Sequence, residues 1–211
     1  RFAIIDKKSK NGQQSSPAMM RKNGKYKDMN YGTIKNYDIA NGTGVRVSLF
    51  VSGCRHHCKG CFNSETWDFN YGNPYTKEVE AEILEALKPA YIQGFSLLGG
   101  EPFEPENQEE LAGLLQKIKE SYPEKNVWCY TGYLYDVDLI PGGKVYTEYT
   151  DKIARLYRYP RRRRVHRSRK NDLTLEFRGS RNQRILHLDE IRQNAEKTKI
   201  ILDEKKTTVY K

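Results

Sequence analysis

Three short apolar runs alternate with two amphipathic segments in the middle of the chain, and this alternation constrains the fold more than any other feature. The runs 45–51, 94–98 and 126–130 are rich in apolar and β-branched residues, which predicts buried strands. Between them, segments 77–88 and 107–121 carry apolar residues at helical spacing. Strand, loop, helix, strand is the order of a parallel sheet, so the sequence predicts an α/β fold.

The segments of unusual composition follow these predicted strands. A cysteine-rich loop follows the first strand, Gly-Gly-Glu-Pro at 99–102 follows the second, and Thr-Gly-Tyr at 131–133 follows the third. In parallel α/β sheets, ligands bind beyond the carboxyl ends of the strands. We therefore expect the three segments to meet at one edge of the sheet and to form the functional site.

Cys54, Cys58 and Cys61 share the first loop with the spacing C-x3-C-x2-C. Three close thiolates suit a cubic [4Fe–4S] cluster with one iron left free for a small molecule, because electron-transfer clusters usually use four cysteines. The alternative is a zinc site with His56 or His57 as the fourth ligand. Zinc sites commonly use a second cysteine pair, which this chain lacks, and two histidines inside the loop would face one metal only with strain.

Size and polarity limit the class of protein. The 211 residues suit one domain with a substantial core. No apolar run approaches the ~18–20 residues of a membrane span, and the first residues lack a signal-peptide core, so we expect a cytoplasmic protein with no membrane partner. Four cysteines could form two disulfides, but three lie within eight residues and Cys129 lies in a predicted strand, which favours metal binding.

Both ends of the chain are polar and lack periodicity. Residues 1–28 are rich in Lys, Asn, Gln and Ser, which predicts a disordered extension, with Met29 as a candidate native start. Residues 29–186 hold all the motifs and form the predicted folded domain. Residues 187–211 form a polar, basic tail.

Two glycine-rich turns have functional and simple interpretations. Gly99 and Gly100 could form an ordinary turn, or they could let a ligand approach the backbone with Glu101 binding an ammonium group. Residues 41–46, Asn-Gly-Thr-Gly-Val-Arg, are not a P-loop, because they precede a strand and do not open a helix. They could form a turn, or face a substrate with Arg46 as an anion contact.

Together these motifs resemble those of the activating proteins of anaerobic (class III) ribonucleoside-triphosphate reductases, a family in the radical S-adenosylmethionine (SAM) superfamily. The cysteine loop alone indicates the superfamily, whereas the turn before it, the short length and the last motif narrow the resemblance to this family. The motifs are the turn 41–46, the cysteine loop with Phe62 and Asn63, Trp67, residues 99–102, residues 131–133, and Arg-Gly-Ser-Arg-Asn-Gln at 178–183.

The resemblance implies a fold, cofactors and a reaction. The fold would be an incomplete (β/α) barrel with mainly parallel strands and a [4Fe–4S] cluster, held by Cys54, Cys58 and Cys61, at its mouth. The open iron would chelate SAM, and one electron from the reduced cluster would cleave SAM to methionine and a 5′-deoxyadenosyl radical. That radical would remove a hydrogen atom from a glycine of the large reductase subunit.

The resemblance also implies binding residues and partners. A reductant such as flavodoxin would supply the electron. The residues implied for SAM binding are Gly99, Gly100, Glu101 and Asn63. The residues implied for contact with the substrate or partner are Asn41, Gly42 and Arg46.

Eight basic residues between Arg158 and Lys170 supply most of the net charge of +10, which would be about +2 without them. A solvated charge run and a nucleic-acid-binding arm are two interpretations. The third is a reading-frame error over 157–170, because the resemblance expects a buried strand there and one permitted back-translation, read in a shifted frame, gives Ile-Asp-Ile-Leu-Val-Asp-Gly. Our hypothesis is two compensating single-base slips, which resequencing the DNA tests, and nucleic acid is then not an expected partner.

Two other functional classes stay open at this point. One is a different radical SAM enzyme, which would activate pyruvate formate-lyase or modify a small molecule such as a deazapurine, and the identity of the partner separates these. The other is a zinc- or nucleic-acid-binding module. Metal content separates this last class from the others, since it would hold zinc in place of iron and sulfide.

Overall fold

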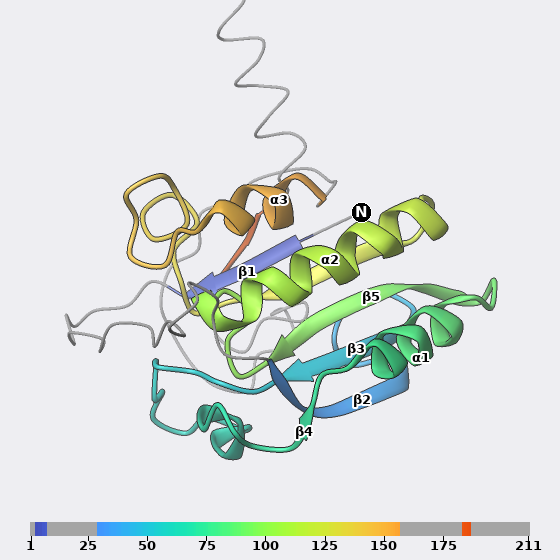
Figure 1. Cartoon of the computed structure of the whole chain (residues 1–211), viewed down its shortest axis with the longest axis horizontal. Coiled ribbons are helices and arrows are strands. Elements are labelled where there is room, and N and C mark those ends of the chain that lie inside the picture. The colour runs from blue at the N-terminus through green and yellow to red at the C-terminus, as the bar shows by residue number, and fades with distance from the viewer. Residues whose placement is uncertain (1–2, 8–28, 157–182, 187–211) are drawn as a thin grey trace, which may run out of the picture.

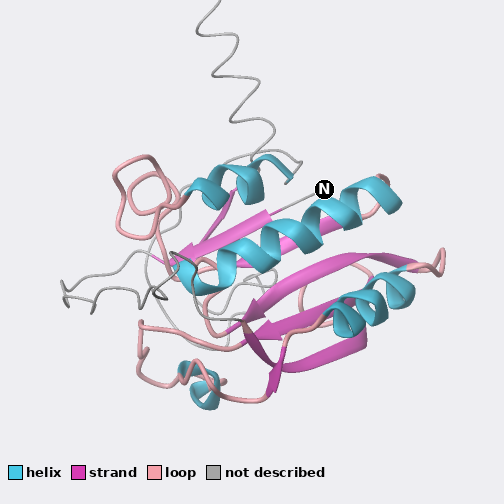
Figure 2. Ribbon diagram, viewed as in Figure 1, coloured by secondary structure: helices cyan, strands magenta, loops and turns pink. Residues whose placement is uncertain are grey.

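The computed structural model describes residues 3–7, 29–156 and 183–186. The strands are β1 (Ala3–Lys7), β2 (Asn30–Asp38), β3 (Val45–Val51), β4 (Asn73–Pro74), β5 (Ile92–Gly99), β6 (Asn126–Tyr130) and β7 (Gln183–Leu186). The helices are α1 (Lys77–Leu87), α2 (Pro105–Ser121) and α3 (Glu148–Leu156), with the short 3-10 helix η1 at Ser64–Trp67. Figure 2 shows how these helices and strands alternate.

The described strands form one open, seven-stranded sheet in the order β4-β2-β3-β5-β6-β1-β7 (Figure 1). In its centre β3, β5, β6 and β1 run parallel to one another. Towards the two edges β2, β4 and β7 pair antiparallel with their neighbours. The predicted α/β class is confirmed, while parallel pairing is confined to the centre of the sheet.

Strands β3, β5 and β6 are buried along most of their length. Val47, Leu49 and Val51 of β3 are fully buried, as are Phe95 and Leu97 of β5. The polar Arg46 and Ser48 of β3 are fully buried as well. Parallel strands inside a sheet are covered on both faces, so apolar residues dominate them. This property makes β3 and β6 predictable from the sequence to the residue, because their apolar runs end where the strands end.

Helices α1 and α2 lie over one face of the sheet, in front of the strands in Figure 1. The Thr76 side chain caps α1 by accepting a hydrogen bond from the Val79 backbone N–H at 3.4 Å. Pro105 opens α2 two residues before the predicted start, in the first turn, where proline is tolerated. In the described part of the chain, no helix combines the length and apolarity needed to cross a membrane.

Strand β1 corrects one prediction. Ala3 pairs with Trp128 and Ile5 with Tyr130, so β1 extends the parallel centre of the sheet next to β6. A disordered extension over residues 1–28 is therefore wrong for Ala3–Lys7, which form this strand. The remainder of that extension, the basic run at 157–170 and the tail at 187–211 lie outside the described residues.

Strand β1 takes a place in the sheet that a later segment of the chain would ordinarily fill. A right-handed crossover from β6 through α3 would ordinarily bring the next segment of chain to this side of β6. In this structure a strand from the other end of the sequence lies there, between β6 and β7.

Candidate functional site

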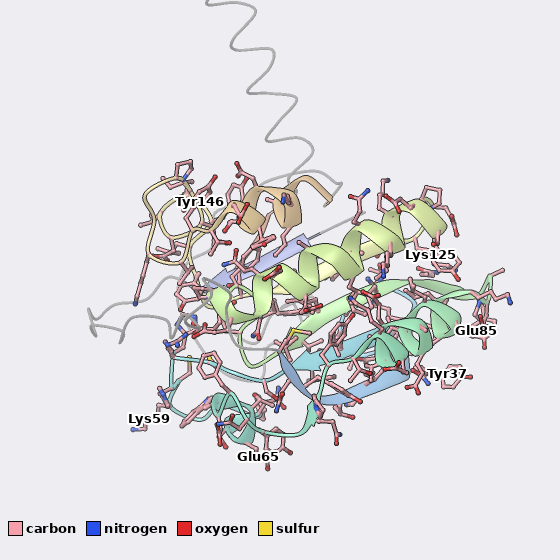
Figure 3. The ribbon with its side chains drawn as sticks, viewed as in Figure 1. Tyr37, Lys59, Glu65, Glu85, Lys125 and Tyr146 are labelled. Carbon is pink, nitrogen blue, oxygen red and sulfur yellow. The ribbon has the colours of Figure 1, made fainter. Side chains whose placement is uncertain are left out.

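The loops that follow β3, β5 and β6 meet beyond the carboxyl ends of these strands, as the parallel order predicts. Backbone hydrogen bonds tie the first two together: the Gly100 N–H donates to the Val51 carbonyl at 2.7 Å, and the Glu101 N–H to the Gly53 carbonyl at 2.8 Å. In Figure 3, Lys59 and Glu65 mark this end of the molecule, while Tyr37 and Lys125 mark the opposite end. The cysteine loop is thus fixed directly on the end of β5.

The two glycines after β5 are needed for this close approach. Gly99 has a φ of +109°, a conformation that residues with a side chain rarely adopt. A Cβ atom added to Gly100 would lie 2.5 Å from the Gly53 carbonyl oxygen and 2.8 Å from that of Thr66. The structure therefore explains Gly-Gly at 99–100 by backbone packing against the cysteine loop, which goes beyond an ordinary turn.

The three cysteines of the loop are free thiols. Cys54 is buried, Cys58 and Cys61 are partly exposed, and the Cys61 N–H donates to the Cys58 carbonyl at 3.0 Å. Burial and the negative charge of Glu101 raise the pKa of the Cys54 thiol, so iron binding must displace its proton.

The arrangement of these thiols bears on the kind of metal group they could hold. Among the described residues, no three Cys, His, Asp or Glu side chains converge on a single ion. In a cubic cluster each cysteine binds a different iron, so such convergence is not required. Three free thiols in one anchored loop are therefore a donor set that fits a [4Fe–4S] cluster.

Glu101 joins all three segments of the site. Its carboxylate is 1% exposed and accepts hydrogen bonds from the Phe103 N–H at 2.9 Å and the Thr131 hydroxyl at 2.7 Å. Its other oxygen accepts from the Gly132 N–H at 2.6 Å and lies 3.0 Å from His56 Nε2. The carboxylate predicted to bind an ammonium group therefore already has four partners in the protein. In this structure it fastens the cysteine loop to the end of β6.

Arg55 forms a second fastening that the sequence analysis missed. Its backbone N–H donates to Glu104 Oε1 at 2.8 Å, and its guanidinium donates to Glu104 and Glu106. The guanidinium also lies 4.4 Å from the centre of the Phe69 ring. The hydrogen bond with Glu106 raises the pKa of Arg55, which stays charged. The signal in the sequence is the pair Glu104 and Glu106, just before and within the first turn of α2. Once buried, these two carboxylates need a basic partner.

The remaining loop residues differ in exposure and contacts. His57 has a φ of +44°, the single positive φ among the described residues other than glycine, and its ring centre lies 4.7 Å from that of Trp67. The Trp67 indole N–H is buried without a hydrogen-bond partner in the described part of the chain. Asn63 is half-buried, and its backbone carbonyl accepts a hydrogen bond from the Thr66 hydroxyl at 2.7 Å. SAM binding by Asn63 stays a prediction.

Comparison with known proteins places this site in a family. Residues 40–186 match the family described as "4Fe-4S single cluster domain". The chain is 41% identical over 126 residues to a protein of Enterobacteria phage T4, covering 55% of this chain and 81% of that protein. The identity is 46% over 110 residues to a protein of Escherichia coli (strain K12), covering 51% and 71%. It is 38% over 137 residues to one of Haemophilus influenzae, covering 58% and 88%.

All three relatives are named anaerobic ribonucleoside-triphosphate reductase-activating protein. The chain belongs to this family. The resemblance seen in the sequence motifs is thus confirmed, and so is a 4Fe-4S domain that includes the cysteine loop.

Arg46 belongs to the domain that matches this family, but it lies away from the cysteine loop. It is 0% exposed. Its Nε–H donates to the Ser96 hydroxyl, and its terminal nitrogens donate to the Thr43 and Phe95 carbonyls and to both oxygens of Asn126, at 2.7–3.2 Å. All five guanidinium donors are used inside the protein, so the prediction of Arg46 as an anion contact is wrong for this structure.

Asn41 and Gly42 belong to the same internal arrangement. The Asn41 side chain donates to Asp38 at 2.6 Å, and its carbonyl accepts from the Ser96 hydroxyl at 2.5 Å. A Cβ atom added to Gly42 would lie 2.8 Å from Arg46 Nε. The turn is therefore built around the buried arginine, at the amino ends of β3 and β5, and its contact with a partner stays a prediction.

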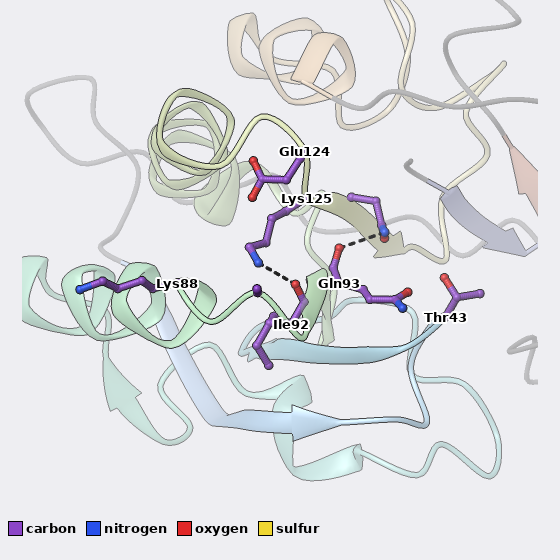
Figure 4. A pocket seen from close by; sticks show the side chains of 8 residues that line it. Thr43, Lys88, Ile92, Gln93, Glu124 and Lys125 are labelled. Carbon is purple, nitrogen blue, oxygen red and sulfur yellow. Dashed lines mark hydrogen bonds between the residues drawn. The ribbon is translucent and has the colours of Figure 1, made fainter.

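A pocket of about 570 Å³ opens at this same end of the sheet (Figure 4). Its lining includes Thr43, Gln93 and Lys125. The Lys125 ammonium group donates to the Ile92 carbonyl at 2.7 Å and to the Pro89 carbonyl at 2.9 Å. Because this cation is already engaged and the cysteines lie at the other end, the pocket is not part of the candidate site.

Proposed function

We propose that this chain is a radical SAM activating enzyme that reductively cleaves SAM at a [4Fe–4S] cluster and generates a glycyl radical on anaerobic ribonucleoside-triphosphate reductase. The observation that carries the proposal is the loop with three free cysteines, held against the ends of β5 and β6. Relatives named as activating proteins of this reductase support the choice of partner.

Each part of the site has a role in this proposal. When bound, the reduced cluster would supply one electron for cleavage of SAM to methionine and a 5′-deoxyadenosyl radical, and that radical would take a hydrogen atom from the target glycine. Cys54, Cys58 and Cys61 would hold the cluster, and Cys54 would lose its proton on binding iron. Gly99 and Gly100 bring the backbone of β5 close to the loop, where a ligand of the cluster could contact it.

The proposal includes finer features of the fold and its surroundings. The central strands β3, β5 and β6 would form part of an incomplete (β/α) barrel of radical SAM type, with the site at their carboxyl ends. The SAM contacts would come from the backbone around Gly99 and Gly100 and from Asn63. Glu101 would contribute if SAM replaced one of its four protein partners. A flavodoxin-type reductant would supply the electron in the reducing cytoplasm, where thiolates stay free.

The test is anaerobic formation of 5′-deoxyadenosine. The protein is reconstituted with iron and sulfide, reduced and given SAM, and the product is quantified. We expect Cys58→Ala to abolish the product, while Cys129→Ala, a buried cysteine of β6 outside the loop, leaves it. A wild-type protein that holds zinc and forms no product would overturn the proposal.

A further inference from the structure

His56 is the middle residue of the segment between Cys54 and Cys58, and its ring is held on three sides. Its Nε2 lies 3.0 Å from Glu101 Oε2. Its ring centre lies 4.3 Å from that of Tyr133. The ring also packs over Gly132, where an added Cβ atom would come within 2.5 Å of ring atoms.

We propose that His56 is a positioning residue that fixes the cysteine loop for cluster binding through its contacts with Glu101, Tyr133 and Gly132. The inference rests on the proposed function, since it concerns how that cluster is held. It gives the histidine a role different from the metal ligand that the sequence also allowed.

The anchor on which His56 rests is rigid. Glu101 is buried, and three other donors fix its carboxylate: the Phe103 N–H, the Thr131 hydroxyl and the Gly132 N–H. These donors come from the loop after β5 and from the end of β6. His56 therefore fastens the cysteine loop to a carboxylate that two parallel strands already hold in place.

The contacts of Arg55 also fasten the cysteine loop to the protein. Arg55 donates to Glu104 and Glu106, which follow Glu101 at the start of α2. The Tyr133 hydroxyl donates to Glu104 at 3.1 Å, so the ring that packs against His56 is fixed to the same acids. Two consecutive residues between cluster ligands are thus anchored on one acidic segment before any metal binds, which preorganises the loop.

The His56 side chain has its partners inside the protein. Its Nε2 is engaged with Glu101, and the ring lies against Tyr133 and Gly132. These contacts fix the middle residue of the segment between Cys54 and Cys58, so they hold the course of the cysteine loop between its first two cysteines.

Iron retention tests this role without measuring catalysis. Wild type, His56→Ala, His56→Gln and the control His57→Ala are reconstituted anaerobically, and the rate of iron loss to a chelator is followed. Removing a residue that orients a metal ligand typically weakens metal binding about 10–100-fold. We expect His56→Ala to lose iron at least ~10-fold faster and His57→Ala to match wild type within about twofold. His56→Gln keeps a donor for Glu101 and should restore most of the retention.

A second pair of variants tests the same contact from the other side and leaves His56 intact. Gly132→Ala would push the ring away, whereas Gly113→Ala, on α2, places its Cβ in open space. We expect faster iron loss only for Gly132→Ala. Thermal unfolding of the cluster-free proteins shows whether each variant is folded, and Gly132→Ala decides the outcome should His56→Ala not fold.

The results separate the possibilities. Equal iron loss for His56→Ala and His57→Ala, or for Gly132→Ala and Gly113→Ala, would overturn the positioning role. Loss of iron from His56→Gln as fast as from His56→Ala would indicate a ligand and would also overturn it. Failure of the proposed function itself would be visible earlier, as zinc or an absent cluster in the wild-type protein.

Discussion

Replacement of Arg46 by methionine should destabilise the cluster-free protein strongly, although Arg46 lies far from the cysteines. The arginine is fully buried and donates five hydrogen bonds to three backbone carbonyls and two side chains. Methionine fills a similar volume but leaves these acceptors without their donor. The reason for the effect is therefore loss of internal hydrogen bonds and not loss of a binding residue.

The size of the effect follows from these contacts. A buried acceptor left without a donor costs about 1–3 kcal/mol, and backbone carbonyls in a sheet keep part of their bonding through the strand ladder. Taking about 1 kcal/mol for each lost bond gives about 3–5 kcal/mol, a large share of the ~5–15 kcal/mol that stabilises a typical domain. Arg46→Lys keeps the charge and up to three donors, so it should lose about half as much.

Urea unfolding of the anaerobic, cluster-free proteins measures this difference. The matched control is Lys35→Met on the neighbouring strand β2, where the exposed ammonium group lies 5.1 Å from the Phe50 ring centre. That contact is worth about 0.5–1 kcal/mol. A loss of less than about 1 kcal/mol for Arg46→Met would refute the reasoning, as would unchanged stability with weakened binding of the reductase.

Three other predictions concern the sheet, the loop and acid stability. Deleting residues 1–7 removes β1 from between β6 and β7, and we expect the melting temperature to fall by at least ~4 °C; an unchanged value would contradict the pairing. Gly100→Ala should lower stability by about 1–3 kcal/mol and reduce iron content, while Gly113→Ala does neither. Burial opposes ionisation of Asp38, but hydrogen bonds from Asn41 and other groups lower its pKa below the ordinary 3.8. Its stabilisation is therefore present above pH 3.8 and lost as pH falls through the lower folded value, so Asp38→Asn should flatten the decline in urea-unfolding free energy below about pH 4.

The parts of the fold that the sequence predicted are those with local signals. Strands β3 and β6 coincide with apolar runs, and α1 and α2 with helical periodicity, because burial on both faces or on one face leaves a pattern in neighbouring residues. Strand β2 was not predicted, since it lies near the edge of the sheet and most of its residues are exposed or half-buried. Strand β1 was missed because its partners lie more than a hundred residues away in the chain.

The candidate site shows the same division. The meeting of the three loops followed from the rule for parallel strands, and the free cysteines from their spacing. The contacts of individual side chains did not follow, because Arg55 and Glu104 are 49 residues apart and His56 and Glu101 are 45 apart. Arg46 was misread for this reason as well: in a sequence, a buried arginine whose acceptors lie 50 and 80 residues away resembles one at the surface.

The most direct measurement of the proposed function is the transfer of a hydrogen atom from the reductase. The reconstituted, reduced protein is given SAM and an anaerobic ribonucleoside-triphosphate reductase that carries α-deuterated glycine, and the 5′-deoxyadenosine is examined by mass spectrometry. We predict one deuterium in the product and an organic-radical EPR signal on the reductase. Product without deuterium, or deuterium transfer from pyruvate formate-lyase but not from the reductase, would contradict the proposed function.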